Sequence, residues 1–160
     1  MKTSFEIRSF SASDASAVQT IIHRGLREVN DRDYPAEIIE EFCNYFSIEK
    51  ILSQAENAHM YVAVSASGGI LGTGSIAPYW GSETESILLT IYVTPELIGR
   101  GIGSAIVKAL EADELFLRSR RIEIPSSPTA VGFYFKMGYL LKNGNEKPDE
   151  EGLIRMEKLR

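Results

Sequence analysis

The sequence contains very little cysteine or histidine, and this shortage argues against several kinds of site. Cys43 is the only cysteine in 160 residues, so no disulfide can form within the chain and a reducing cytoplasm is the expected compartment. Cys43 falls at an apolar helical position beside Phe42 and Phe46, which favours a small core residue over a nucleophile. His23 and His59 lie far apart without cysteine neighbours, so we expect no metal site.

An excess of basic residues and long apolar runs are also missing. The net charge is −5, which argues against non-specific binding to nucleic acid or to an anionic membrane surface. No apolar run approaches the roughly 20 residues that span a bilayer. The first ten residues lack the apolar core and cleavage site of a signal peptide. We therefore expect a cytoplasmic protein with no nucleic acid and no membrane among its partners.

The apolar pattern predicts a single α/β domain over residues 1–160. An antiparallel meander of three strands comes first, and a crossover helix leads to a further strand. The third strand of the meander, 85–93, is apolar on both faces, which is typical of a central strand. In chain order the pattern predicts a strand at 5–10, helices at 13–29 and 35–46, a short turn at 47–54, strands at 60–66, 70–77 and 85–93, a helix at 101–116, a strand at 121–125, a helix at 129–137, and strands at 139–142 and 153–159.

A glycine-rich stretch, LIGRGIGSA at 97–105, lies between the strand at 85–93 and the helix that follows. Backbone N–H groups at a helix N-terminus have no intrahelical partner and attract anions, and glycine lets a phosphate approach them closely. No lysine follows as in a P-loop, and the spacing does not fit the dinucleotide-binding G-x-G-x-x-G/A pattern. Spacing alone leaves two interpretations open, namely a phosphate cradle and a simple strand-to-helix turn.

Two segments resemble a known family. YVTPELIGRGIGSAIVKALE (92–111) resembles motif A of the GNAT superfamily of N-acetyltransferases, and AVGFYFKMGYLL (130–141) resembles that family's A-x-x-F-Y-x-K-x-G-F segment. The resemblance implies the GNAT fold, an α/β (α+β) fold whose mixed, mostly antiparallel sheet has six to seven strands and about four helices. It also implies acceptor-side helices at about 13–54 and an acetyl-CoA-binding core at about 60–142.

The resemblance implies roles for individual residues. Backbone groups of the glycine turn would hold the coenzyme's pyrophosphate, and the 91–93 strand would run beside its pantetheine arm. The implied coenzyme-binding residues are Ile91, Tyr92, Val93, Ile98, Gly99, Arg100, Gly101, Ile102, Gly103, Ser104, Ser127, Phe133 and Tyr134. Three positions depart from the family pattern: Ile98 replaces the usual Arg or Gln, Ser127 an Asn, and Tyr139 a Phe.

The implied chemistry is direct transfer of an acetyl group from acetyl-CoA to a primary amine. Tyr134 would be the general acid, and the alternative is a tyrosine that only packs in the core or touches the coenzyme. Glu83 and Glu85 are candidates for the general base, although charge at a surface loop is the commoner explanation for such residues. Tyr79 and Trp80 could line an acceptor pocket or simply end a strand.

The amine acceptor, a small molecule or a peptide or protein, is expected beside the acidic stretch at 29–42, whose carboxylates would attract a cation or merely form a solvated helix face. Two alternatives to the proposed reaction remain: transfer of a different acyl group, and a non-catalytic acyl-CoA-binding sensor or regulatory module. A homodimer is a possible assembly, with the last strands as its contact.

Overall fold

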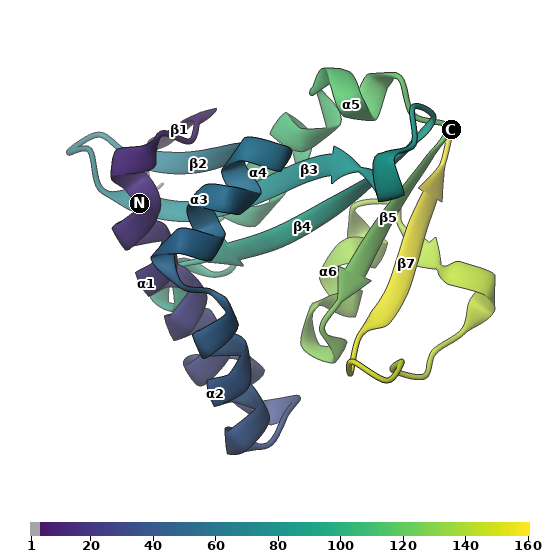
Figure 1. Ribbon diagram of the computed structural model, residues 1–160, viewed down its shortest axis with the longest axis horizontal. Coiled ribbons are helices and arrows are strands. Elements are labelled where there is room, and N and C mark those ends of the chain that lie inside the picture. Colours follow the sequence, from purple (N-terminus) through teal and green to yellow (C-terminus); the bar gives the residue numbers. More distant parts are fainter. Residues whose placement is uncertain (1–3) are drawn as a thin grey trace.

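A mixed seven-stranded sheet organises the molecule, whose computed structural model describes residues 4–160. The strands lie in the order β1-β2-β3-β4-β5-β7-β6 (Figure 1). The elements in chain order are β1 (Phe5–Ser9), α1 (Ala15–Glu28), α2 (Ala36–Tyr45), α3 (Ile48–Asn57), β2 (His59–Ser65), β3 (Ile70–Pro78), β4 (Glu85–Val93), α4 (Ile102–Glu111), α5 (Glu114–Leu117), β5 (Arg121–Ser126), α6 (Val131–Lys136), β6 (Leu140–Leu141) and β7 (Ile154–Leu159).

Strand β4 is the centre of the sheet, as its apolar sequence predicted. It pairs with β3 antiparallel and with β5 parallel, and the other neighbouring strands are antiparallel, so the expected mixed, mostly antiparallel sheet is confirmed. The parallel contact is short, because only 85–87 of β4 pair with 121–123 of β5. Beyond it the two strands diverge (Figure 1), and the second half of β4 has no partner on that side among the described residues.

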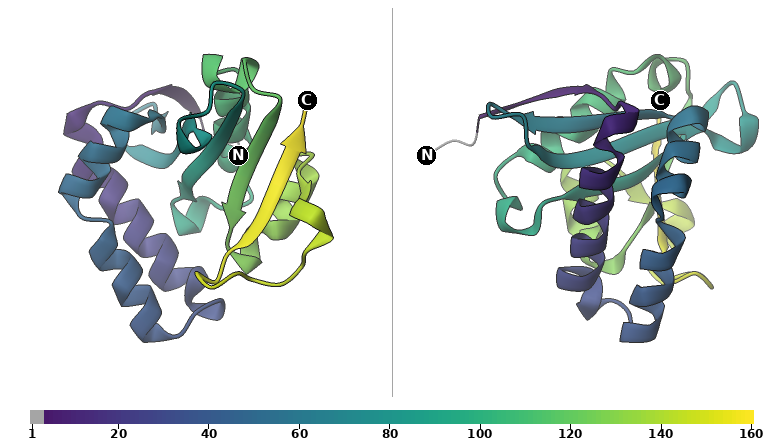
Figure 2. Two further views of the ribbon diagram at one scale, coloured as in Figure 1. Left: turned by 45° about the vertical axis from the view of Figure 1, so that its right-hand side comes forward. Right: turned by 60° about the vertical axis from the view of Figure 1, so that its left-hand side comes forward.

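Two apolar cores form, one on each face of the sheet. Helices α4, α5 and α6 cover one face, where Leu88, Ile106 and Ile122 are fully buried in a single cluster. Helices α1, α2 and α3 cover the other face around β2, with Ile22 and Val62 at the centre of a second cluster. Figure 2 shows α1 and α2 lying side by side and extending past the end of the sheet. This arrangement leaves them facing the region where β4 and β5 diverge.

The helices differ from the prediction in number and length, since residues 4–160 contain six α-helices instead of about four. The expected turn at 47–54 is a full helix, α3, whose N-terminal Ser47 accepts a hydrogen bond from the Lys50 N–H at 3.1 Å. The helix expected to reach Phe116 ends at Glu111, because the Asp113 carboxylate caps a new helix, α5. Within these residues no helix has the length and apolar character needed to cross a bilayer.

Candidate active site

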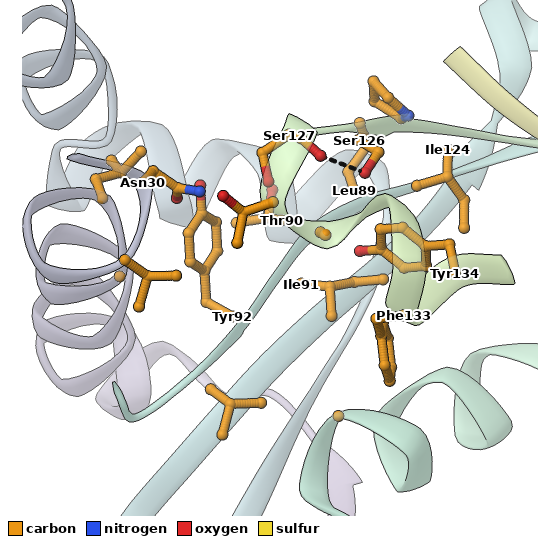
Figure 3. Close-up of a pocket in the computed structure, with 18 of the residues that line it drawn as sticks. Asn30, Leu89, Thr90, Ile91, Tyr92, Ile124, Ser126, Ser127, Phe133 and Tyr134 are labelled. Carbon is orange, nitrogen blue, oxygen red and sulfur yellow. Dashed lines mark hydrogen bonds between the residues drawn. The ribbon is translucent and has the colours of Figure 1, made fainter. Parts of the chain in front are cut away.

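A cavity of about 900 Å³ lies where β4 and β5 diverge. The second half of β4, the glycine turn before α4, the end of β5 and the start of α6 form one part of its lining. The connection between α1 and α2 forms the other part, so helices and strands from both halves of the sheet meet around one space (Figure 3). Its volume is in the range of small-molecule and cofactor sites.

The glycine turn presents bare backbone to this cavity. Gly99 and Gly101 have φ angles of +87° and +86°, the left-handed region that favours glycine, and Gly101 is the N-cap of α4. A Cβ at either position would have no heavy atom of the described chain within 4 Å. Gly103 and Ser104 also line the cavity. The N-terminus of a ten-residue helix is therefore directed at the cavity, which suits an anion.

The side chains of Ile98, Arg100 and Ile102 in the predicted turn lie in three different surroundings. Ile98 lines the cavity with a side chain that is 54% exposed. The Ile102 side chain is buried in the core beneath the sheet, and the Arg100 side chain is exposed and is not part of the cavity lining. Within residues 4–160 no lysine, arginine or histidine lines the cavity. An anion held there would depend on backbone N–H groups and the helix dipole.

Strand β4 contributes a bulged backbone. Thr73 of β3 pairs with Tyr92 and Ser75 pairs with Leu89, so one residue, Gly74, faces two residues of β4. One of these, Thr90, has a φ of +56°. Residues 88–93 all line the cavity, including the predicted Ile91, Tyr92 and Val93. Because β5 no longer pairs with this half of the strand, its edge is open toward the cavity.

Tyr134 projects from α6 into the cavity with Phe133 and Ser127 nearby in the lining (Figure 3). Its side chain is 6% exposed, and its hydroxyl has no hydrogen-bond partner among the described residues. Burial raises the pKa of the Tyr134 hydroxyl well above its usual value, so the phenol is protonated at neutral pH. The Tyr134 ring is buried, whereas its protonated and unpaired hydroxyl is accessible from the cavity, which suits it to donating a proton to a bound group.

The two glutamates expected to act as the general base lie at or just before the start of β4, the end at which β4 and β5 still pair. Glu85 pairs with Arg121 of β5, Oε1 to Nε at 2.6 Å, at the position where the two strands still pair. Glu83 is exposed in the preceding loop. Tyr79 packs under the Arg121 guanidinium, and Trp80 is 91% exposed. The structure brings none of these four predicted residues to the cavity lining as described for residues 4–160.

Two other carboxylates reach the cavity. Glu41 of α2, which belongs to the predicted acidic stretch, and Glu151, which precedes β7, are the only charged side chains in its described lining. Four aromatic side chains also line the cavity on the α1–α2 side, and these are Tyr34, Phe42, Tyr45 and Phe46. Nothing in the sequence pointed to Glu151, because it lies in an irregular turn without motif or periodicity. Residues 4–160 contain no cluster of three side chains suited to a metal ion.

Hydrogen bonds tie the α1–α2 connection to the opposite wall of the cavity. The Asp33 carboxylate accepts bonds from the Thr129 N–H at 3.1 Å and the Thr129 hydroxyl at 2.6 Å. The Tyr34 hydroxyl donates to the Gly152 carbonyl at 2.7 Å, and burial together with Asp33 and Asp149 raises the pKa of Tyr34 to about 12. These bonds link the α1–α2 connection to the turn just before α6 and to the turn before β7.

Comparison with known proteins finds a family match over part of the chain and similar folds over nearly all of it. The family described as "Acetyltransferase (GNAT) domain" matches residues 56–140. Three solved structures share the fold: a GCN5-related N-acetyltransferase from Rhodopseudomonas palustris (19% identity, TM-score 0.78, 100% of this chain and 98% of that one), the PaiA N-acetyltransferase from Thermoplasma acidophilum in complex with coenzyme A (23%, 0.79, 98% and 99%), and Ard1 from Thermoplasma volcanium (20%, 0.71, 98% and 97%). No curated protein sequence matches the chain.

Proposed function

The chain belongs to the GNAT acetyltransferase family, and from this premise we propose that it transfers an acetyl group from acetyl-CoA to a primary amine. The observation that carries the proposal is one continuous cavity that joins the glycine turn, the open edge of β4, the Tyr134 hydroxyl and the α1–α2 connection. A coenzyme thioester and an amine need such a shared space in order to react directly. The PaiA relative was crystallised with coenzyme A, which supports the same class of ligand here.

The coenzyme's diphosphate binds at the turn formed by residues 98–104. Backbone N–H groups and the α4 dipole hold it, since no cation lines the described cavity. Gly99 and Gly101 leave room for the phosphate oxygens at positions where a side chain would project into the site. Ile98, where the family pattern has a polar residue, contributes only apolar contact with its exposed side chain.

The pantetheine arm runs along the open edge of β4 and pairs with the backbone of Ile91, Tyr92 and Val93. The divergence of β5 leaves N–H and C=O groups on this edge for the arm's two amides, as an added strand would use them. A backbone N–H from the same edge polarises the thioester carbonyl and stabilises the oxyanion that forms on attack.

The steps of acetyl transfer follow from which group holds each proton and where that proton goes. The neutral amine attacks the carbonyl carbon and forms the C–N bond, and the tetrahedral intermediate collapses with cleavage of the C–S bond. The Tyr134 hydroxyl donates its proton to the leaving thiolate, and the proton released by the amine passes to solvent, from which Tyr134 is reprotonated. Deprotonation of the amine is not assigned to Glu83 or Glu85, because the Glu85 carboxylate is held by Arg121 away from the cavity.

The acceptor carries positive charge and no carboxylate. Glu41 and Glu151 favour a cation, and an acceptor with its own carboxylate would find no cationic partner among the described lining residues. The aromatic side chains from α1 and α2 suit the hydrocarbon part of a slender amine. The bridge from Asp33 to Thr129 also disfavours a broad acceptor such as a folded protein surface.

The test combines coenzyme binding with thiol release. Acetyl-CoA should raise the melting temperature, and free thiol should then appear with 1,4-diaminobutane more readily than with butylamine, and least with 4-aminobutanoate, which has the same chain but a carboxylate. Stabilisation without thiol release from any amine or peptide would favour an acyl-CoA sensor, an alternative to which the Ile98 departure gives some support. Absence of stabilisation by any acyl-CoA would contradict both functions.

A further inference from the structure

Thr90 has a backbone conformation that is costly for threonine. Among the described non-glycine residues only Trp80, Thr90 and Asn143 have positive φ, and the other two lie in short turns, whereas Thr90 is inside strand β4. The left-handed region is a genuine outlier for a β-branched residue, and such strain persists only where the surroundings enforce it. Neighbouring groups must therefore hold Thr90 in this conformation.

The strained residue decides which way the coenzyme-binding part of β4 faces. Leu88 and Ile91 both pack into the core beneath α4, although residues three apart on a regular strand point to opposite faces. Thr90 is the additional residue that reverses the alternation, so Tyr92 faces α1 while Ile91 and Val93 face α4. Without the bulge, every side chain and backbone dipole of 91–93 would be turned to the other side.

One side chain bonds the bulge from outside the strand. The amide nitrogen of Gln54, on α3, donates to the Thr90 hydroxyl at 2.8 Å and to the Ser75 hydroxyl at 3.0 Å. Ser75 is fully buried on β3 and pairs with Leu89, the residue just before Thr90. Gln54 thus uses both protons of its amide to connect the two strands on either side of the irregularity.

We propose that Gln54 is a positioning residue for coenzyme A, which holds Thr90 in the left-handed conformation and so directs the backbone of 91–93 toward the pantetheine arm. Gln54 does not line the cavity described above, and it acts only through Thr90 and Ser75. The inference rests on the coenzyme site proposed above. Its claim that Gln54 holds the backbone of Thr90, however, concerns the protein without coenzyme. The two claims can therefore fail separately.

A mutant cycle with Thr90→Gly tests the proposal. Gln54→Met keeps the side-chain length but removes both donors, and it should weaken coenzyme A binding by about tenfold in calorimetric titration. Glycine adopts positive φ without strain, so in the Thr90→Gly background the same Gln54 change should cost less than about threefold. Gln54→Glu, whose oxygens can accept from the Ser75 and Thr90 hydroxyls, should stay within about threefold of the wild type.

Carbon chemical shifts of Thr90, which depend on φ, give a second measurement that needs no ligand. They should indicate positive φ in the wild type and a return to ordinary strand values in Gln54→Met. Equal losses of coenzyme affinity in both backgrounds, or a Thr90 that keeps positive φ without Gln54, would overturn the proposal. If the Thr90 shifts change as expected between the wild type and Gln54→Met but the wild type binds no coenzyme A, the coenzyme site is contradicted and, with it, the assigned purpose of the bulge.

Discussion

Replacing Gly101 by alanine should reduce both stability and coenzyme A affinity, whereas the same replacement at Gly68 should reduce stability alone. Both glycines have strongly positive φ, +86° and +91°, and a Cβ at either would meet no heavy atom of the described chain within 4 Å. The backbone strain of alanine is thus matched in the two variants. They differ in location, because Gly101 begins α4 at the cavity and Gly68 lies in the turn between β2 and β3.

The expected stability loss is about 1–2 kcal/mol for each variant, the cost of a left-handed non-glycine residue. For a chain of this size that loss corresponds to a melting temperature lower by about 2–8 °C. At a coenzyme A concentration about 100 times the wild-type dissociation constant, binding stabilises the wild type by about 2.7 kcal/mol. If the new Cβ weakens binding tenfold, the stabilisation of Gly101→Ala falls to about 1.4 kcal/mol, while Gly68→Ala keeps the full value.

The assay is thermal unfolding of the three proteins with and without coenzyme A at one fixed concentration. Melting without ligand reports the strain, and the ligand-induced rise reports the affinity. Identical ligand-induced rises in Gly101→Ala and Gly68→Ala would refute the placement of the diphosphate at the glycine turn. A Gly68→Ala variant with an impaired rise would show that general destabilisation, and not the site, controls the measurement.

Two further predictions concern the acid and the buried ion network. Tyr134→Phe should lower turnover by about a hundredfold or more while coenzyme A affinity changes little, and unchanged steady-state rates across pH would exclude Tyr134 as the acid. Glu123 is 1% exposed and bonded to Arg121, Lys142 and Arg155, so Glu123→Gln should cost about 3–5 kcal/mol in urea unfolding at pH 7. Burial alone would raise the pKa of Glu123, but hydrogen bonds from Lys142 and Arg121 lower it, so its stabilisation is complete above the unfolded value of about 4.3 and is lost as pH falls through the folded value. The gap between wild type and Glu123→Gln should therefore narrow below about pH 4, and a gap independent of pH would contradict the assignment.

The parts of the site that the sequence predicted are those fixed by local chain geometry. Gly99 and Gly101 could be predicted because left-handed backbone favours glycine, and Phe133 and Tyr134 could be predicted because they belong to a spaced motif. The strands and the central position of β4 followed from apolar alternation for a similar reason. Each of these features depends on residues close together in the chain.

The parts that the sequence could not predict depend on contacts between distant segments. Glu85 was a candidate base on its position alone, and only the pairing of β4 with β5 places it against Arg121. Glu151 reaches the cavity because a long irregular turn folds back toward α1 and α2, where the Tyr34 hydroxyl bonds Gly152. The sequence did not predict the end of α4 at Glu111, because the helical apolar pattern continues past it into α5.

Left-handed backbone therefore serves the proposed coenzyme site in two places, the glycine turn and strand β4, and the sequence encodes the two in opposite ways. At Gly101 the residue itself permits positive φ, so the turn needs no bond from a distant side chain. The glycine therefore lets the sequence predict the turn. At Thr90 the residue resists the conformation, and the bulge depends on Gln54, which lies 36 residues away. A threonine there supplies a hydroxyl that Gln54 can bond, whereas glycine would bulge without any link to α3. The chain thus couples the direction of residues 91–93 to the packing of α3 against the sheet, which a glycine at this position would not do.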